Sequence, residues 1–305
     1  MPARSPLPPD YIKDVNVRYH DAAAAEYDSK WGIDFGPIGQ EQVRGKLVKA
    51  LGEWPPEPFG DALEIGSGTG YFSLNLLQLG AIERLVATDI SPEMLATLSA
   101  TAKRLGLSAG TRVADAETLP FPDESFDLVL GHAVLHHLPD LDGALAEFHR
   151  VLRPGGAIAF CGEPSRYGDL LAALPKRGAL LAAPLWRFAL GASARKPEGE
   201  ANGDGHKLEP EVDVHAFAPA RLDGMLGNAG FETVRISGEE LLANVYGWAV
   251  RTLEGSAEPD EVPYRWRELA FRGYIALQRL DTVLLEPRLP PSIFYNLVLS
   301  ARKPA

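Results

Sequence analysis

Residues 63–71, LEIGSGTGY, place three glycines between a short apolar run and a segment of helical composition. Glycines at such a junction permit a tight turn and a close approach of a ligand to the backbone, because no Cβ stands in the way. The spacing is G-x-G-x-G and not G-x-G-x-x-G, so the start of the following helix is less clearly shaped for a pyrophosphate. A glycine loop alone is a weak signal, and its meaning depends on what surrounds it.

The segments around this loop alternate between strand and helix. The predicted strands are 61–65, 84–89, 111–115, 126–131 and 157–161, followed later by 231–237 and 294–303. Residues 12–28 and 39–52 have helical composition and precede all of them. This alternation predicts an α/β fold, a Rossmann-like doubly wound sheet with helices on both faces.

Several helix boundaries carry local signals. Ser91 can cap a helix that has Pro92 at its first position, and Asp140 can cap the helix that follows the fourth strand. The pair Gly155-Gly156 is predicted to end that second helix. Pro219 is predicted to open a later helix.

Carboxylates follow the glycine loop at informative positions. Asp89 ends the second predicted strand, where it can accept both hydroxyls of a ribose, and Asp115 follows the third, where it can accept from the amine of an adenine. Glu64 stands just before the loop, where a carboxylate suits a cationic ligand. The alternatives are that Asp89 only caps a turn before Ser91 and that Asp115 is a loop residue without a partner.

Four segments carry a family resemblance: LEIGSGTGYF, VATDISPEML, VADAETLPFPDESFDLVLGHAVLHHLPD and RVLRPGGAIAF. Together they resemble class I S-adenosylmethionine-dependent methyltransferases, in particular the subgroup of the ubiquinone/menaquinone C-methyltransferases. The resemblance is close over residues 40–165. It implies a seven-stranded sheet, mostly parallel, with its last strand antiparallel, and S-adenosyl-L-methionine as cofactor with S-adenosyl-L-homocysteine as product.

The resemblance also implies which residues hold the cofactor. The methionine end would contact Glu64, Gly66, Ser67 and Gly68, and the backbone of His132 would lie beside it. Asp89 would hold the ribose, Ile90 would pack on the adenine, and Asp115 and Ala116 would meet the adenine edge. Tyr27 resembles a tyrosine that closes over the cofactor, although a plain helix-packing role fits it equally well.

A general base is needed only when the acceptor holds its proton tightly, because the sulfonium already makes the methyl group electrophilic. His136 and His137 follow the fourth predicted strand, and Glu163 follows the fifth. A histidine oriented by a carboxylate is a workable base near neutral pH. The alternative is that one histidine caps or packs beside Pro139, and the sequence does not choose between the two histidines.

The predicted organisation includes two insertions into the α/β pattern. It comprises a disordered tail at 1–11, N-terminal helices with the cofactor-binding half at 12–164, a cap insertion at 165–215, a core helix and strand at 216–238, a second helical insertion at 239–291, and the final strand at 292–305. Both insertions begin after a strand, at the edge where ligands bind in parallel sheets, so they can roof the site. Residues 197–211, rich in glycine and acid, predict a mobile loop.

Composition excludes some functions. The net charge of −11, from 30 basic and 41 acidic residues, disfavours a nucleic-acid partner. Cys161 is the only cysteine, so the sequence predicts neither an intrachain disulfide nor a zinc cluster built from cysteines, no metal site is predicted, and a reducing, cytoplasmic location fits. No signal peptide or membrane-spanning run is predicted.

Residues 165–196 differ from the rest of the chain. They contain six basic residues against one acid and are rich in leucine, with a tryptophan and a phenylalanine. Such a segment can contact a lipid surface or an acidic hydrophobic substrate. The alternative is an ordinary helical lid with a solvated basic face.

The sequence therefore predicts an enzyme that transfers a methyl group to a small, hydrophobic acceptor by in-line displacement. Two alternatives stay open: a dinucleotide-dependent oxidoreductase and a non-catalytic module that binds S-adenosylmethionine. The identity of the acceptor, the atom methylated and the oligomeric state are not predicted.

Overall fold

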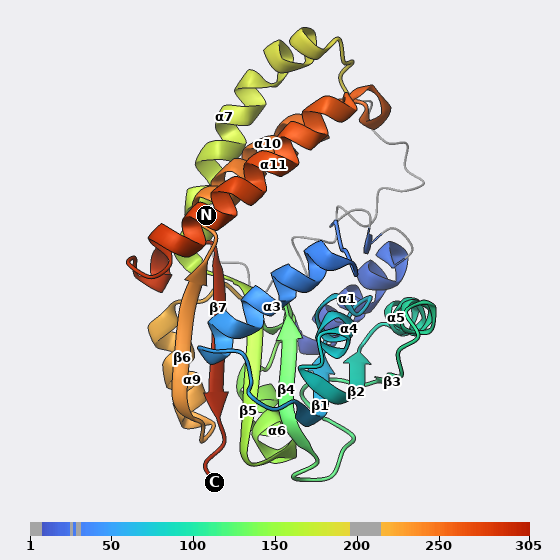
Figure 1. The fold of residues 1–305 in the computed structure, drawn as a ribbon, viewed down its shortest axis with the longest axis vertical. Helices are drawn as coiled ribbons and strands as arrows, with labels where there is room; N and C mark the ends of the chain where they lie inside the picture. Colours follow the sequence, from blue (N-terminus) through green and yellow to red (C-terminus); the bar gives the residue numbers. More distant parts are fainter. Residues whose placement is uncertain (1–7, 25–26, 29–31, 196–214) are drawn as a thin grey trace.

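A seven-stranded sheet forms the centre of the protein (Figure 1). The structure, a computed structural model, describes residues 8–24, 27–28, 32–195 and 215–305. The strands are β1 (Phe59–Ile65), β2 (Ile82–Asp89), β3 (Gly110–Val113), β4 (Phe126–His132), β5 (Leu152–Pro164), β6 (Glu232–Glu239) and β7 (Asn296–Arg302). Their order is β3-β2-β1-β4-β5-β7-β6, and β7 runs antiparallel to both of its neighbours. The predicted fold, with its antiparallel last strand, is confirmed.

Helices cover both faces of the sheet. They are α1 (Pro9–Ala23), α3 (Pro37–Leu51), α4 (Tyr71–Gln78), α5 (Pro92–Arg104), α6 (Leu141–Val151), α7 (Arg166–Leu190), α9 (Pro219–Asn228), α10 (Leu242–Gly255) and α11 (Tyr264–Leu280). Short helical turns are η1 (Leu135–His137), η2 (Pro259–Glu261), η3 (Asp281–Leu285) and η4 (Pro291–Ile293). One apolar core contains Phe148 of α6 and Leu226 of α9, and a second contains Leu47 of α3 and Phe72 of α4. Full burial of each such side chain stabilises the fold by roughly 1.5–3 kcal/mol.

Local signals set most helix starts. Ser91 Oγ accepts the N–H of Met94 at 3.1 Å, and Asp140 Oδ1 accepts the N–H of Gly143 at 3.0 Å, so both predicted caps are confirmed. Helix α1 begins at Pro9, inside the tail predicted for residues 1–11, and a proline at the first position suits a helix start.

The predicted end of α6 at Gly155-Gly156 is wrong. The helix ends at Val151, and β5 begins at the next residue, where Leu152 pairs with Phe126 of β4. Strand pairing therefore captures the chain before the glycines, and Gly155, at φ +76°, lies within the irregular start of β5.

The helices described within the two predicted insertions form an arm. Helices α7, α10 and α11 extend away from the sheet toward one end of the molecule (Figure 1). α10 packs against α7 and α11, and the rings of Trp186 and Trp266 meet edge to face with centroids 5.2 Å apart. The loop predicted at 197–211 lies outside the described residues.

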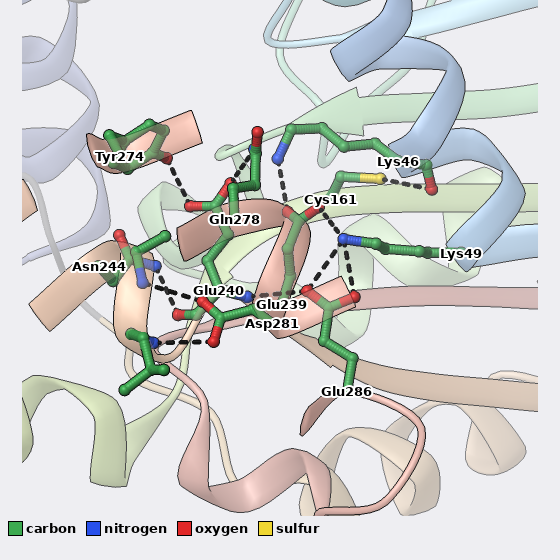
Figure 2. A network of polar contacts seen from close by, with 12 residues as sticks. Lys46, Lys49, Cys161, Glu239, Glu240, Asn244, Tyr274, Gln278, Asp281 and Glu286 are labelled. Carbon is green, nitrogen blue, oxygen red and sulfur yellow. Dashed lines mark hydrogen bonds and ion pairs between the residues drawn. The ribbon is translucent and has the colours of Figure 1, made fainter. Parts of the chain in front are cut away.

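A network of buried polar groups fastens this arm to the sheet (Figure 2). Lys46 and Lys49 of α3 both pair with Glu239 at the end of β6, and Lys49 also pairs with Glu286 at 2.9 Å. Burial would lower the pKa of Lys46, but the attractions of Glu239, Glu240 and other nearby groups together outweigh it, so this pKa lies well above its usual value.

The next residue, Glu240, extends the network into the arm. Its carboxylate accepts from the hydroxyl of Tyr274 and from the amide of Gln278, each at 2.7 Å. Asp281 is buried and accepts the N–H groups of Leu242 and Ala243 at the start of α10. The arm is therefore joined to the core by charged hydrogen bonds as well as by apolar packing.

Candidate active site

The glycine loop between β1 and α4 adopts a conformation that favours glycine. Gly66 and Gly68 have φ values of +57° and +51°, in the left-handed region. A Cβ on Gly66 would lie 2.3 Å from Cγ2 of Val134, whereas a Cβ on Gly68 would meet no atom within 4 Å. Gly66 therefore packs against the loop after β4, and Gly68 faces open space.

Asp89 connects the glycine loop to the next helix. Its Oδ2 accepts the N–H of Gly68 at 2.8 Å, and its Oδ1 accepts the N–H of Ser91 at 2.9 Å. The side chain is buried, and burial raises the pKa of Asp89, opposed by His20. The turn-capping alternative is thus part of what Asp89 does, while the same carboxylate also lines a cavity.

The cavity lies at the carboxyl edge of β1, β2 and β4. It encloses about 760 Å³ of empty space, including its mouth. Eight of the ten cofactor residues predicted from the sequence line it: Tyr27, Gly66, Gly68, Asp89, Ile90, Asp115, Ala116 and His132. The remaining lining residues are Lys13, Asn16, His20, Ile65, Thr88, Ala114, Glu117, Ala133, Val134, His137, Leu138 and Pro139.

Two predicted cofactor residues, Glu64 and Ser67, lie outside this lining. Glu64 is buried and accepts a hydrogen bond from the hydroxyl of Ser73 on α4. Burial raises the pKa of Glu64 to about 8, against the lowering effect of Ser73. Ser67 is also buried, and its Oγ has no hydrogen-bond partner in the described part of the chain.

The cavity is bordered by α1 beside Asp115. Lys13 Nζ lies 2.7 Å from Asp115 Oδ2 and also pairs with Glu117. Asp115 Oδ1 accepts the N–H of Glu117 at 3.0 Å. Asp115 therefore has a charged partner, and the loop-residue alternative without a partner is wrong.

His132 ends β4 and lines the cavity with its ring against Tyr71, the two centroids being 5.4 Å apart. Burial lowers the pKa of His132 to about 3, so its ring is neutral at physiological pH. Its Nε2 is buried and has no hydrogen-bond partner among the described residues. An unsatisfied nitrogen beside the cavity is a place where a ligand or water can donate or accept.

The three candidate catalytic residues separate into a pair and a single side chain. Glu163 and His136 are buried, with Glu163 Oε2 2.9 Å from His136 Nδ1. His137 lies on the cavity side, and its ring centroid is 3.9 Å from that of His136 and 5.8 Å from that of His20. The structure thus brings the predicted carboxylate to His136, while His137 is the histidine of the two that lines the cavity.

Lys13, Asn16 and His20 are lining residues that sequence reasoning missed. They are spaced by three and four residues on α1, so they share one face of the helix, and that spacing was a readable signal. His20 Nδ1 lies 2.9 Å from the backbone oxygen of Asn16, which fixes the ring at the cavity wall.

These residues suit an adenosyl group. The left-handed glycines leave open space beside Gly68, a buried carboxylate ends β2, a second carboxylate follows β3, and unpartnered polar atoms of Ser67 and His132 lie nearby. A nucleoside with a charged tail matches this order of groups along the carboxyl edge of a Rossmann-like sheet. The fold and the cavity define a nucleoside-cofactor-binding protein of the α/β class.

Comparison with known proteins shows to which family of nucleoside-cofactor-binding proteins the chain belongs. A family model described as a methyltransferase domain matches residues 63–160. A malonyl-[acyl-carrier protein] O-methyltransferase of Methylococcus capsulatus is 31% identical over 223 residues, 73% of this chain and 72% of that protein. The chain belongs to the class I S-adenosylmethionine-dependent methyltransferases, and it is an enzyme of methyl transfer.

Solved structures support the fold. The [4+2]-cyclase SpnF has a TM-score of 0.60 at 17% identity, covering 99% of this chain and 100% of that one. A Haemonchus contortus phosphoethanolamine N-methyltransferase, solved with S-adenosylhomocysteine, has a TM-score of 0.61 at 15% identity, covering 96% of this chain and 60% of that one. The resemblance to the ubiquinone/menaquinone subgroup is not confirmed, because the similar relative carries a malonyl-carrier O-methyltransferase name.

Proposed function

We propose that the cavity seats S-adenosylmethionine between Asp89 and Asp115 and presents its methyl group to a small, largely apolar acceptor beside η1. One observation carries the proposal: the cavity that Asp89 and Asp115 line is also lined by apolar residues. These are Ile65, Ile90, Ala114, Ala116, Ala133, Val134, Leu138 and Pro139. The bound cofactor supplies an electrophilic methyl group, and the chain must orient the acceptor and exclude water.

In this proposal, His137 accepts the proton of the acceptor and His136 acts as a positioning residue. His137 lines the cavity, whereas His136 is buried against Glu163. We expect H137A to lower kcat by about 100-fold with little change in affinity for S-adenosylhomocysteine. H136A should lower the free energy of unfolding, because it removes the buried partner of Glu163, and should change kcat per folded enzyme much less than H137A does. Turnover within a few-fold of the parent in both variants would remove the base role.

The acceptor proposal is tested with methyl-labelled S-adenosylmethionine and a fractionated cell extract. Label in the low-molecular-weight organic-soluble fraction, lost in D89N, is the expected result. In D89N an amide replaces one oxygen that accepts from Gly68 or Ser91, so an N–H is left unsatisfied, and we expect the affinity for S-adenosylhomocysteine to fall by about 10–100-fold.

A second candidate acceptor is an acyl carboxyl group, because the similar relative is named a malonyl-carrier O-methyltransferase. Label that stays with the protein fraction and is released by mild alkali would identify a methyl ester on a carrier and overturn the small apolar acceptor. Alkali-stable label on a small molecule would instead identify transfer to carbon or nitrogen, or to an ether oxygen. Calorimetry with NAD should show no binding, and binding of NAD in place of S-adenosylhomocysteine would refute the proposed use of the cavity.

A further inference from the structure

Helix α7 carries a row of large apolar side chains on its outer face, here called the apolar stripe. The stripe consists of Tyr167, Leu171, Leu174, Leu181, Leu185 and Phe188. Successive members are separated by three, four or seven residues, which places them along one side of a helix. Leu174, Leu181, Leu185 and Phe188 are 68%, 85%, 73% and 85% exposed. Single exposed apolar residues are ordinary, but a continuous row of them marks an interaction surface.

The opposite side of α7 has the reverse composition. Ala172, Ala179 and Ala183 are buried, on the side where small side chains let α7 pack closely against the arm. The helix therefore buries its small residues and exposes its large ones. Packing within the described part of the chain does not cover the apolar stripe, which therefore suits an external partner.

The charge of α7 indicates the chemistry of that partner. The helix contains four basic residues and one acidic residue, so its formal charge is 4 − 1 = +3, within a chain of net charge −11. Lys176 lies over the ring of Trp248 at 3.7 Å, and Arg187 donates to the backbone of Ser256, so these two turn toward α10. Arg166 and Arg177 are exposed, and at 100° per residue both lie along one flank of the apolar stripe.

We propose that the apolar stripe docks α7 onto an anionic lipid surface, with its leucines and phenylalanine in the interfacial region and Arg166 and Arg177 at the headgroups. This is the arrangement of an amphipathic helix that lies in a membrane interface. In the described part of the chain, no helix is long and apolar enough to cross a membrane. The arm extends away from the acidic body (Figure 1), so the stripe can reach a flat surface while repulsion holds the body off.

Charge favours a lipid surface over a second copy of this chain. Two copies paired antiparallel through the stripe near its centre, Gly178, would bring Arg177 of each helix close to the other. Like charges at such a distance oppose pairing, whereas anionic headgroups attract the same groups. The inference concerns where the protein acts, so it does not depend on the acceptor.

Flotation of the full chain with two kinds of vesicle tests the proposal. One contains phosphatidylcholine alone, and the other contains phosphatidylcholine and phosphatidylglycerol in equal parts. We expect flotation with the anionic vesicles at low salt, weaker flotation at high salt, and none with phosphatidylcholine alone. No association with anionic vesicles at low salt would overturn the proposal.

Matched variants assign the contact to the stripe. L181E/F188E should weaken binding by more than about tenfold, whereas I38E, an exposed apolar residue of α3 on the body, should not. R166E/R177E should weaken binding by at least about thirtyfold, from about 1 kcal/mol for each lost charge. K103E/R104E on α5 makes the same change in net charge away from the arm and should bind nearly as the parent does.

Each variant is first shown to bind S-adenosylhomocysteine with parental affinity, which confirms that the core is folded. Equal loss in the arm and body variants would refute docking through α7, since net charge alone would then explain binding. A concentration-dependent dimer that L181E/F188E abolishes, without vesicle binding, would assign the stripe to a second copy and overturn the lipid partner.

Discussion

Glu163 Oε2 lies 2.9 Å from Nδ1 of His136, and the same carboxylate accepts the N–H groups of Val134, Leu135 and His136 at 2.9–3.2 Å. A buried carboxylate with four donors fixes the conformation of the segment that it binds. Here that segment is η1 with its preceding residue, and it places His137 and the following Leu138 at the cavity. Glu163 therefore acts through the backbone of η1 as well as through His136.

This relationship predicts the effect of E163Q. The amide keeps one acceptor but places an NH₂ group against N–H donors, so we expect a loss of about 2–3 kcal/mol in the free energy of unfolding. Urea unfolding followed by circular dichroism measures the change, with an unchanged slope indicating a true stability effect. D140N is the matched control, because asparagine caps a helix about as well as aspartate. Equal midpoints for the two variants would contradict a structural role for Glu163.

Alanine substitutions at three glycines with left-handed backbones distinguish the effects of backbone strain, of collision with a neighbouring side chain and of lost space for a ligand. Gly80, at φ +68° with no atom near its would-be Cβ, reports strain alone, so G80A should cost about 1 kcal/mol. G66A adds a collision with Val134 and should cost a further 1–3 kcal/mol, roughly the penalty of overpacking. G68A should match G80A in stability.

The distinction between G68A and G80A lies in ligand binding. A Cβ on Gly68 would project into open space at the cavity, so we expect at least about tenfold weaker binding of S-adenosylhomocysteine. G80A should bind with parental affinity in the same calorimetric titration. If G68A binds as tightly as G80A, the cofactor does not approach this glycine.

The sequence predicted those parts of the site that local rules control. The carboxyl ends of parallel strands meet at one edge, so the strand pattern alone was enough to place Asp89 and Asp115 together. The caps at Ser91 and Asp140 depend on neighbouring residues and were confirmed. The end of α6 failed, because pairing of Leu152 with β4 overrides the glycine signal.

Other features depend on tertiary placement. Neighbouring strand residues point to opposite faces, so Ile65 reaches the cavity while Glu64 turns to Ser73, and the glycine pattern does not reveal which one faces the ligand. Lys46 and Glu239 are separated by 193 positions in sequence, and no periodicity connects them. Helix α1 does not follow a strand of the sheet, so the rule that ligands bind at the carboxyl ends of strands does not predict that one of its faces lines the cavity.

The buried pair of Lys46 and Glu239 predicts a strong asymmetry between single and double variants. K46M leaves a buried carboxylate with only Lys49 beside it, and we expect a loss of about 3–5 kcal/mol. K46M/E239Q removes both charges and should recover part of that loss. R272M breaks the exposed Arg272–Glu268 pair on α11 and should change stability by less than about 0.5 kcal/mol.

The measurement is again urea unfolding, read at 25 °C and at neutral pH. A double variant no more stable than K46M would show that removing the second charge gives no compensation and that this pair does not stabilise the contact between α3 and β6.

Burial of Glu64 predicts that stability falls as pH rises toward 8. Its pKa in the folded protein is about 8, above the ordinary value of 4.5, so the folded state binds the proton more tightly than the unfolded state does. Between these values the native state holds more protons, and the free energy of unfolding decreases with rising pH. His132 has a lowered pKa, about 3, so its opposite contribution is confined to pH values below about 6.5, and above that pH its ring is neutral in both states.

The window from about pH 6.5 to 8 therefore isolates Glu64 from His132. One proton corresponds to about 1.36 kcal/mol for each pH unit, so Glu64 contributes a decrease of up to about 2 kcal/mol across this window. E64Q retains an uncharged group that can still accept from Ser73, and it should remove this part of the slope. Because other buried carboxyls titrate equally in both proteins, the difference between the two pH profiles reports Glu64 alone. Parallel profiles for the parent and E64Q would mean that Glu64 is already ionised in the folded protein at neutral pH.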